Sequence, residues 1–214
     1  MFQRSLTPLT GMVVCIGLMV ASFEDNKWNI IKKGVLATNP IYYQKESDIS
    51  KDDNSIKELT ISDEVKMQLS TEKKVIEDFW KILTYYKNPT LMTFNGRNFD
   101  APFLMLRSAI YKIRPPYNLM AGTKFSYPSH IDLIDELSYY SMSSYGATRR
   151  FNFDFYSQSF GITSPKAQGV DGSKVPDFFA SGKIEEISDY CMRDVRATWE
   201  LFHFWLEYLC FKSV

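Results

Sequence analysis

Two stretches of the sequence place acidic side chains where they could do chemistry. The first, residues 93–104 (TFNGRNFDAPFL), has the pattern of a strand end, a turn at Asn95-Gly96 and a helix start with Asp100 in its first turn. In α/β folds, ligands bind beyond the carboxyl ends of the strands. The pattern predicts that Asp100 lies at such a position. Asp100 could also simply cap the helix, and for this stretch alone that simpler interpretation is favoured.

The second stretch, residues 187–198 (ISDYCMRDVRAT), has helical character. Tyr190 and Asp194 are four residues apart, so they share one face of the predicted helix. A tyrosine hydroxyl beside a carboxylate can hold a cation and orient a water molecule. A polar stripe on an amphipathic helix gives the same pattern, and for this stretch alone it is the favoured interpretation.

Together, the two stretches resemble the second and third motifs of the proofreading-type 3′-5′ exonucleases in the ribonuclease H-like superfamily. The resemblance is to the branch of predicted exonucleases related to the exonuclease domain of family B DNA polymerases. Its second motif, Phe-Asn-Gly-x-x-Phe-Asp-x-Pro-Phe, matches residues 94–103, and its third, Tyr-Cys-x-x-Asp-Val-x-x-Thr, matches residues 190–198. Residues 8–17, 130–133 and 170–175 also agree, so the resemblance covers most of the chain outside residues 44–58.

The resemblance implies a metal-dependent exonuclease in which acidic residues hold two divalent cations, Mg²⁺ or Mn²⁺. Asp100 and Asp194 would be metal ligands, and Tyr190 would orient the attacking water; these three are the implied catalytic residues. The implied reaction is in-line hydrolysis of the terminal phosphodiester, which releases nucleoside monophosphates. Two cations suit this reaction because one activates water while the other offsets charge on the leaving oxygen. Such hard cations prefer carboxylate oxygens.

One motif of the family has no counterpart in this sequence. The family carries Asp-x-Glu on the opening strand of its sheet, whereas the residues before Pro8, MFQRSLT, contain no acid, and Glu24-Asp25 has the wrong spacing. We therefore expect an amino-terminally incomplete domain that lacks its central opening strand, binds metal weakly and hydrolyses slowly or not at all. Two alternatives stay open: a degenerate module that binds nucleic acid or a protein partner without catalysis, and an opening strand supplied by another chain.

Several side chains near Asp100 could contact a nucleic-acid strand. Asn95, Arg97 and Asn98 lie in the loop that precedes it, and Phe99 could stack on a base. For each of them, packing within the protein or ordinary solvation is the competing interpretation.

A further candidate contact lies in the loop 164–174, where Lys166 could reach a phosphate. No feature of the sequence reads a 2′-hydroxyl, so the residues themselves do not separate DNA from RNA. We take single-stranded DNA as the preferred substrate, and the sequence identifies no protein partner.

The order of predicted strands and helices indicates an α/β domain, and the resemblance implies a mixed, ribonuclease H-like sheet flanked by helices. The hydrophobic spacing predicts a hairpin of strands 11–23 and 28–31 and a third strand over 91–94. Residues 44–58 are predicted to form an exposed polar loop. Helices are predicted from Thr71 to 88 with Ser70 as the cap, and over 99–113, 132–140 with Asp132 as the cap, 151–160 and 183–211.

The composition sets outer limits on this interpretation. With 214 residues and 45% hydrophobic content, the chain predicts a single globular domain over 1–214. Its 25 basic and 25 acidic residues cancel, so any nucleic-acid contact must be local. Three cysteines without a CxxC pair argue against a disulfide framework and favour a reduced, cytoplasmic setting. The apolar run 12–21 is too short to span a membrane.

Overall fold

The computed structural model describes residues 7–44, 56–62, 65–141, 143, 145–163 and 172–211. Strands and helices alternate irregularly along the chain. The strands are β1 (Cys15–Glu24), β2 (Lys27–Thr38), β3 (Lys57–Thr60), β4 (Lys66–Ser70), β5 (Leu91–Thr93) and β6 (His130–Asp132). The helices are α1 (Ile41–Gln44), α2 (Glu72–Tyr85), α3 (Asp100–Ile110), α4 (Leu133–Leu137), α5 (Phe153–Ser159), α6 (Val175–Ala180) and α7 (Ile184–Tyr208).

The strands form two sheets. Four of them follow the order β1-β2-β4-β3, in which β2 and β4 run parallel and the other neighbours antiparallel. The other two, β5 and β6, pair in parallel with Thr93 opposite Asp132. With helices on both sides, this arrangement confirms the predicted class, a mixed α/β sheet of the ribonuclease H-like type.

Within the described residues, β1 and β5 are each paired along one edge only. No residue of β1 is buried, whereas residues 35–38 of β2 are all buried. An unpaired strand edge leaves N–H and C=O groups that need water or another strand. These two edges are those between which the family resemblance predicts the opening strand.

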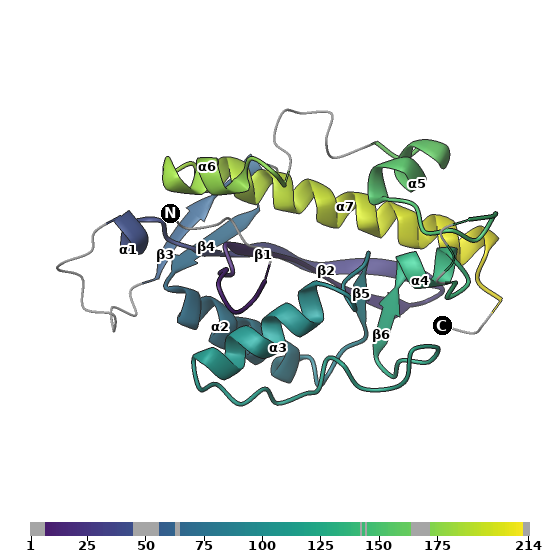
Figure 1. Ribbon diagram of the computed structural model, residues 1–214, viewed down its shortest axis with the longest axis horizontal. Helices are drawn as coiled ribbons and strands as arrows, with labels where there is room; N and C mark the ends of the chain where they lie inside the picture. The colour runs from purple at the N-terminus through teal and green to yellow at the C-terminus, as the bar shows by residue number, and fades with distance from the viewer. Residues whose placement is uncertain are drawn as a thin grey trace.

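Helices cover the two faces of the sheet (Figure 1). Helices α6 and α7 lie on one face, α2 and α3 lie on the other, and α4 and α5 lie beside the later turns of α7. Three hydrophobic clusters fill the layers. Their centres include Phe79 and Trp80 of α2, Met67 of β4 against Ile187 of α7, and Leu201 of α7.

The hydrophobic period of α2 places its apolar side chains on the sheet, as the sequence predicts. The buried set is Val75, Ile76, Phe79, Trp80 and Leu83. The predicted cap, Ser70, is wrong by one residue: Thr71 Oγ1 accepts the Lys74 N–H at 3.3 Å.

A buried ion pair ties the start of the sheet to α2 and α3. Glu72 Oε1 accepts the Val13 N–H at 2.8 Å and Arg107 Nε at 2.8 Å, and Oε2 accepts Arg107 at 2.6 Å and the Tyr111 hydroxyl at 2.8 Å. Glu72 is 1% exposed, so every oxygen needs such a donor. The network fixes the orientation of α3, whose first residue is Asp100.

Several short elements differ from the predicted ones. The hairpin is confirmed, but β2 continues to Thr38, seven residues beyond the predicted strand. Lys57 and Glu58 belong to β3 and not to a loop, while residues 45–55 of the predicted loop lie outside the described residues. The predicted helix 132–140 is only five residues long as α4.

None of the helices in the described segments is long and apolar enough to cross a bilayer.

Candidate functional site

The loop between β5 and α3 is held by its own backbone. Asn95 adopts a positive φ of 66°, and its carbonyl accepts the Phe99 N–H at 3.1 Å. At Gly96 a Cβ would come within 2.4 Å of Thr93 Oγ1, so the loop needs glycine there. Phe99 occupies the N-cap position, and Asp100 is the first helical residue. Asp100 therefore stands beyond the carboxyl end of β5 without being the capping residue.

A buried carboxylate from the neighbouring strand clamps this loop. Asp132 is 1% exposed, and its Oδ1 accepts the Asn95 N–H at 2.6 Å while Oδ2 accepts the Arg97 N–H at 2.8 Å. It can reach both because β5 and β6 are parallel and end side by side. The sequence predicts Asp132 only as a helix cap. It does occupy the N-cap position of α4, but its two oxygens serve the loop that carries Asp100.

The two acidic residues of the predicted site influence each other. Asp100 has its pKa raised to about 6, first by desolvation, and also by the charges of Asp132 and Asp194. Asp100 nevertheless stays open to solvent on one side, and Asp194 is half-buried. The charge of the Asp194 carboxylate on α7 therefore acts on Asp100 of α3, although the two residues are 94 positions apart in the sequence.

Asp194 also lies near the first strand. The pKa of the Cys15 thiol is raised well above its usual value, first by a hydrogen bond with Cys191, then by burial and by the charges of Cys191 and Asp194. Helix α7 approaches β1 closely at Gly17, where a Cβ would lie 2.9 Å from Cys191 Sγ and 3.0 Å from Val195 Cγ2. A glycine at this point of β1 therefore allows α7 to bring Asp194 over the sheet.

Tyr190 lies one turn before Asp194 on α7, as the four-residue spacing predicts. Its side chain is half-buried, and the Arg193 guanidinium carbon lies 5.9 Å from the centre of its ring. The charge of Asp194 thus acts on Asp100, and Tyr190 lies on the same helix as Asp194.

The residues predicted to contact nucleic acid fall into three groups. Asn98 and Phe99 are exposed beside Asp100; Asn98 Nδ2 donates to Asn95 Oδ1 at 3.4 Å, and Phe99 is 39% exposed. Arg97 instead faces inward, and Lys166 lies outside the described residues.

The guanidinium of Arg97 is engaged within the protein. Its NH1 donates to the carbonyls of Leu119 at 3.0 Å and Ala121 at 2.9 Å, and its central carbon lies 4.1 Å from the centre of the Tyr127 ring. These contacts brace the loop. Contact between Arg97 and nucleic acid stays a prediction.

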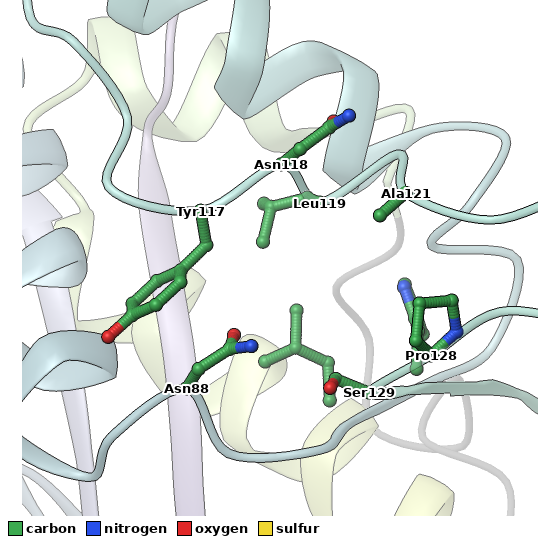
Figure 2. A pocket seen from close by; sticks show the side chains of 9 residues that line it. Asn88, Tyr117, Asn118, Leu119, Ala121, Pro128 and Ser129 are labelled. Atoms are coloured by element: carbon green, nitrogen blue, oxygen red, sulfur yellow. The ribbon is translucent and has the colours of Figure 1, made fainter.

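A cavity of about 150 Å³, whose lining contains no acidic residue, includes the first residues of β5 and β6. Figure 2 shows the side chains that line it. Its lining includes Asn88, Leu91, Asn118 and His130. Leu91 and His130 are the first residues of their strands, whereas Asp132 is the last residue of β6. The cavity therefore opens at the opposite ends of the strands. His130 Nε2 lies 2.8 Å from Thr93 Oγ1, and burial lowers the pKa of His130 to about 4.

The acidic site offers the type of ligand atom that a hard divalent cation prefers, but it offers too few ligands. Asp100 and Asp194 offer carboxylate oxygens, the ligands that Mg²⁺ and Mn²⁺ prefer. In the part of the chain that the structure describes, however, no group of three histidine, cysteine or acidic residues could hold a metal ion. The site therefore supplies only part of a metal coordination sphere.

The mixed strand pairing with helices on both faces defines the class, a ribonuclease H-like α/β domain, in which Asp100 lies beyond the carboxyl end of β5. Residues 43–212 match the family described as a predicted 3′-5′ exonuclease related to the exonuclease domain of PolB, and the chain belongs to this family. The resemblance stated from the motifs is thereby confirmed. The match begins within α1, so it does not include the β1–β2 hairpin.

A curated relative supports the same family. DNA polymerase 1 of Sulfolobus acidocaldarius is 28% identical over 137 residues, which cover 61% of this chain and 15% of the polymerase. The chain thus corresponds to a small part of that polymerase's length.

Proposed function

We propose that this chain acts as a metal-dependent 3′-5′ exonuclease domain that removes nucleotides from single-stranded nucleic acid, with DNA preferred over RNA. Membership of the family supports nuclease chemistry. The observation that carries the proposal is the position of Asp100, the first residue of α3, beyond the carboxyl end of β5. The charge of Asp194 also acts there, and a divalent cation would neutralise both carboxylates. The setting we propose is cytoplasmic, and we propose no protein partner.

In this proposal Asp100 and Asp194 are ligands of a two-cation site for Mg²⁺ or Mn²⁺, and Tyr190 orients the attacking water through its hydroxyl. One cation would supply an activated water, and the other would offset the charge on the leaving oxygen. Asp132 acts through the loop by keeping the backbone at Asn95 and Arg97 in place.

Contacts to the terminal nucleotide would come from residues around Asp100. Asn95 and Asn98 offer amide groups to sugar or phosphate oxygens, and the exposed ring of Phe99 offers a face for a base. Lys166 is retained as a proposed phosphate contact.

A second candidate is a non-catalytic nucleic-acid-binding module. The observation that favours it is the short supply of ligands, because the described residues contain no three-ligand metal group. Two carboxylates hold a cation weakly, so hydrolysis by this chain should be slow even if the first function is right.

The test is a nuclease assay on the purified chain with Mn²⁺ and a 5′-labelled single-stranded DNA. We expect slow shortening from the 3′ end with release of nucleoside monophosphates, which stops when EDTA removes the metal. Asp194→Ala should abolish the shortening. Asp189→Ala is the matched control, because Asp189 lies on the same helix but accepts hydrogen bonds from Ser62.

Two outcomes would contradict the proposal. Shortening that survives in Asp194→Ala would come from a contaminant or from another site. Binding of the DNA without any Mn²⁺-dependent shortening would support the non-catalytic module instead.

A further inference from the structure

Three side chains form a column on the surface beside α5. The Arg149 guanidinium carbon lies 4.4 Å from the centre of the Phe151 ring, and the Phe151 and Phe155 rings stack at 4.4 Å with an angle of 11° between their planes. A ring has only two faces, so a stacked ring on one face leaves the other for the guanidinium. The order is therefore Arg149, Phe151, Phe155.

Both ends of this column face solvent. Phe155 is 49% exposed although Phe151 covers one of its faces, which leaves the opposite face open. Arg149 is exposed as well. The column therefore presents an open aromatic face at one end and an exposed cation at the other.

The neighbouring side chains point inward and anchor the segment near the acidic site. Arg150 forms an ion pair with Asp135 of α4, and Phe153 packs against Phe94 with ring centres 4.9 Å apart. Phe94 directly precedes Asn95, the start of the loop that carries Asp100. Helix α5 lies beside α4 and the later turns of α7 (Figure 1), and the contact of Phe153 with Phe94 links the column to the strand end that precedes this loop.

We infer that Arg149, Phe151 and Phe155 form a binding platform for single-stranded nucleic acid, in which a base stacks on the open face of Phe155 and a phosphate pairs with Arg149. Aromatic faces bind bases of any sequence, and an arginine fork suits phosphate oxygens. A chain with zero net charge needs such local contacts, because its overall field attracts no polyanion. The inferred role of the platform, guiding a 3′ end toward Asp100, rests on the proposed function.

The test measures binding rather than cleavage. A fluorescein-labelled oligothymidylate is titrated with the protein in EDTA, and fluorescence anisotropy gives the Kd. We expect Phe155→Ala to raise the Kd about tenfold, the effect of losing one base–ring stack. Phe155→Trp should bind as tightly as the wild type. Arg149→Gln should weaken binding and reduce the slope of log K against log salt by about 0.7, the value for one phosphate contact on a single strand.

Matched controls come from the opposite side of the molecule. Tyr85→Ala removes another exposed ring, 77% exposed on α2, and Arg114→Gln removes another exposed arginine. Both should bind like the wild type. Thermal melting of every variant confirms that it is folded.

The inference would be overturned if the wild type fails to bind, if Phe155→Ala binds as well as the wild type, or if Tyr85→Ala weakens binding equally. Because no divalent cation is present, loss of binding in Phe155→Ala supports the platform even if the chain proves unable to hydrolyse DNA.

Discussion

A single buried carboxylate, that of Asp132, organises the loop that presents Asp100. Both of its oxygens accept backbone N–H groups, from Asn95 and Arg97, and hydrogen bonds to a charged acceptor are stronger than neutral ones. An asparagine has the same shape, but it can accept only at its oxygen and would point its NH₂ group at the other N–H. One of the two clamping bonds would therefore be lost and replaced by a repulsive contact.

We predict that Asp132→Asn destabilises the chain by about 1–3 kcal/mol, because a buried N–H loses its acceptor. Amide hydrogen exchange by NMR should show faster exchange at Asn95 and Arg97. Asp135→Asn is the control: Asp135 is also buried, but it bonds Arg150 and Tyr127, so exchange at Asn95 and Arg97 should stay unchanged. Equal exchange in wild type and Asp132→Asn would contradict the clamp.

The raised pKa of Asp100 makes the stability of the folded chain depend on pH in a definite direction. Between its usual pKa of 3.8 and about 6, the folded chain holds a proton that the unfolded chain has released. The contribution of Asp100 to stability is therefore most favourable at low pH and falls as the pH rises through this window.

We predict that, in EDTA, Asp100→Asn gains stability relative to the wild type as the pH rises from about 4 to about 7. The gain should be no more than about 1 kcal/mol, because solvent screens the exposed side of the carboxylate. Thermal melting at both pH values measures it. A difference between variant and wild type that is the same at both pH values would show that the charge of Asp100 carries no penalty in the folded chain.

Among the elements, the contact between β1 and α7 decides where Asp194 lies. The backbone of β1 at Gly17 nearly touches the side chains of Cys191 and Val195, which flank Asp194 on the helix. A methyl group at residue 17 would overlap both side chains. The helix or the strand would then have to shift, and overpacking of this kind costs about 1–3 kcal/mol.

We predict that Gly17→Ala lowers the free energy of unfolding by about 1–3 kcal/mol, measured by urea denaturation. Gly172→Ala is the matched control, because a Cβ there meets no atom within 4 Å. If Gly17→Ala is as stable as the wild type, α7 does not rest on β1 as closely as the structure shows.

Sequence patterns predict the long elements better than the short ones. The hairpin, α2, α3 and α7 were all predicted, because their apolar periods extend over many residues. The short strands β3, β4 and β6 and the helix α6 have too few residues to show a period, and tertiary pairing decides their structure. The same limit applies to the site, where the motifs predict Asp100 and Asp194. The clamp by Asp132 and the bracing of Arg97 join residues 22 to 37 positions apart, so no local pattern reveals them.

At the scale of the whole molecule, the candidate site depends on elements next to both sheets. β1 contacts α7, β5 leads to Asp100, and each of these strands has one unpaired edge among the described residues. The candidate metal ligands are thus contributed by helices on opposite faces of the sheet. The distance between the Asp100 and Asp194 carboxylates depends on how both helices pack on the sheet. Cation binding by the two residues therefore tests the fold and the site together.

The central claim is that Asp100 and Asp194 both bind the divalent cations of the site, and a Mn²⁺ titration followed by NMR tests it most directly. Paramagnetic Mn²⁺ broadens the amide signals near its binding site. We predict that residues 95–100 and 190–194 broaden together, with weak affinity on the order of 10⁻³ M, and that Asp194→Ala abolishes the broadening in both segments. Broadening of one segment alone, or broadening that persists in Asp194→Ala, would contradict the claim.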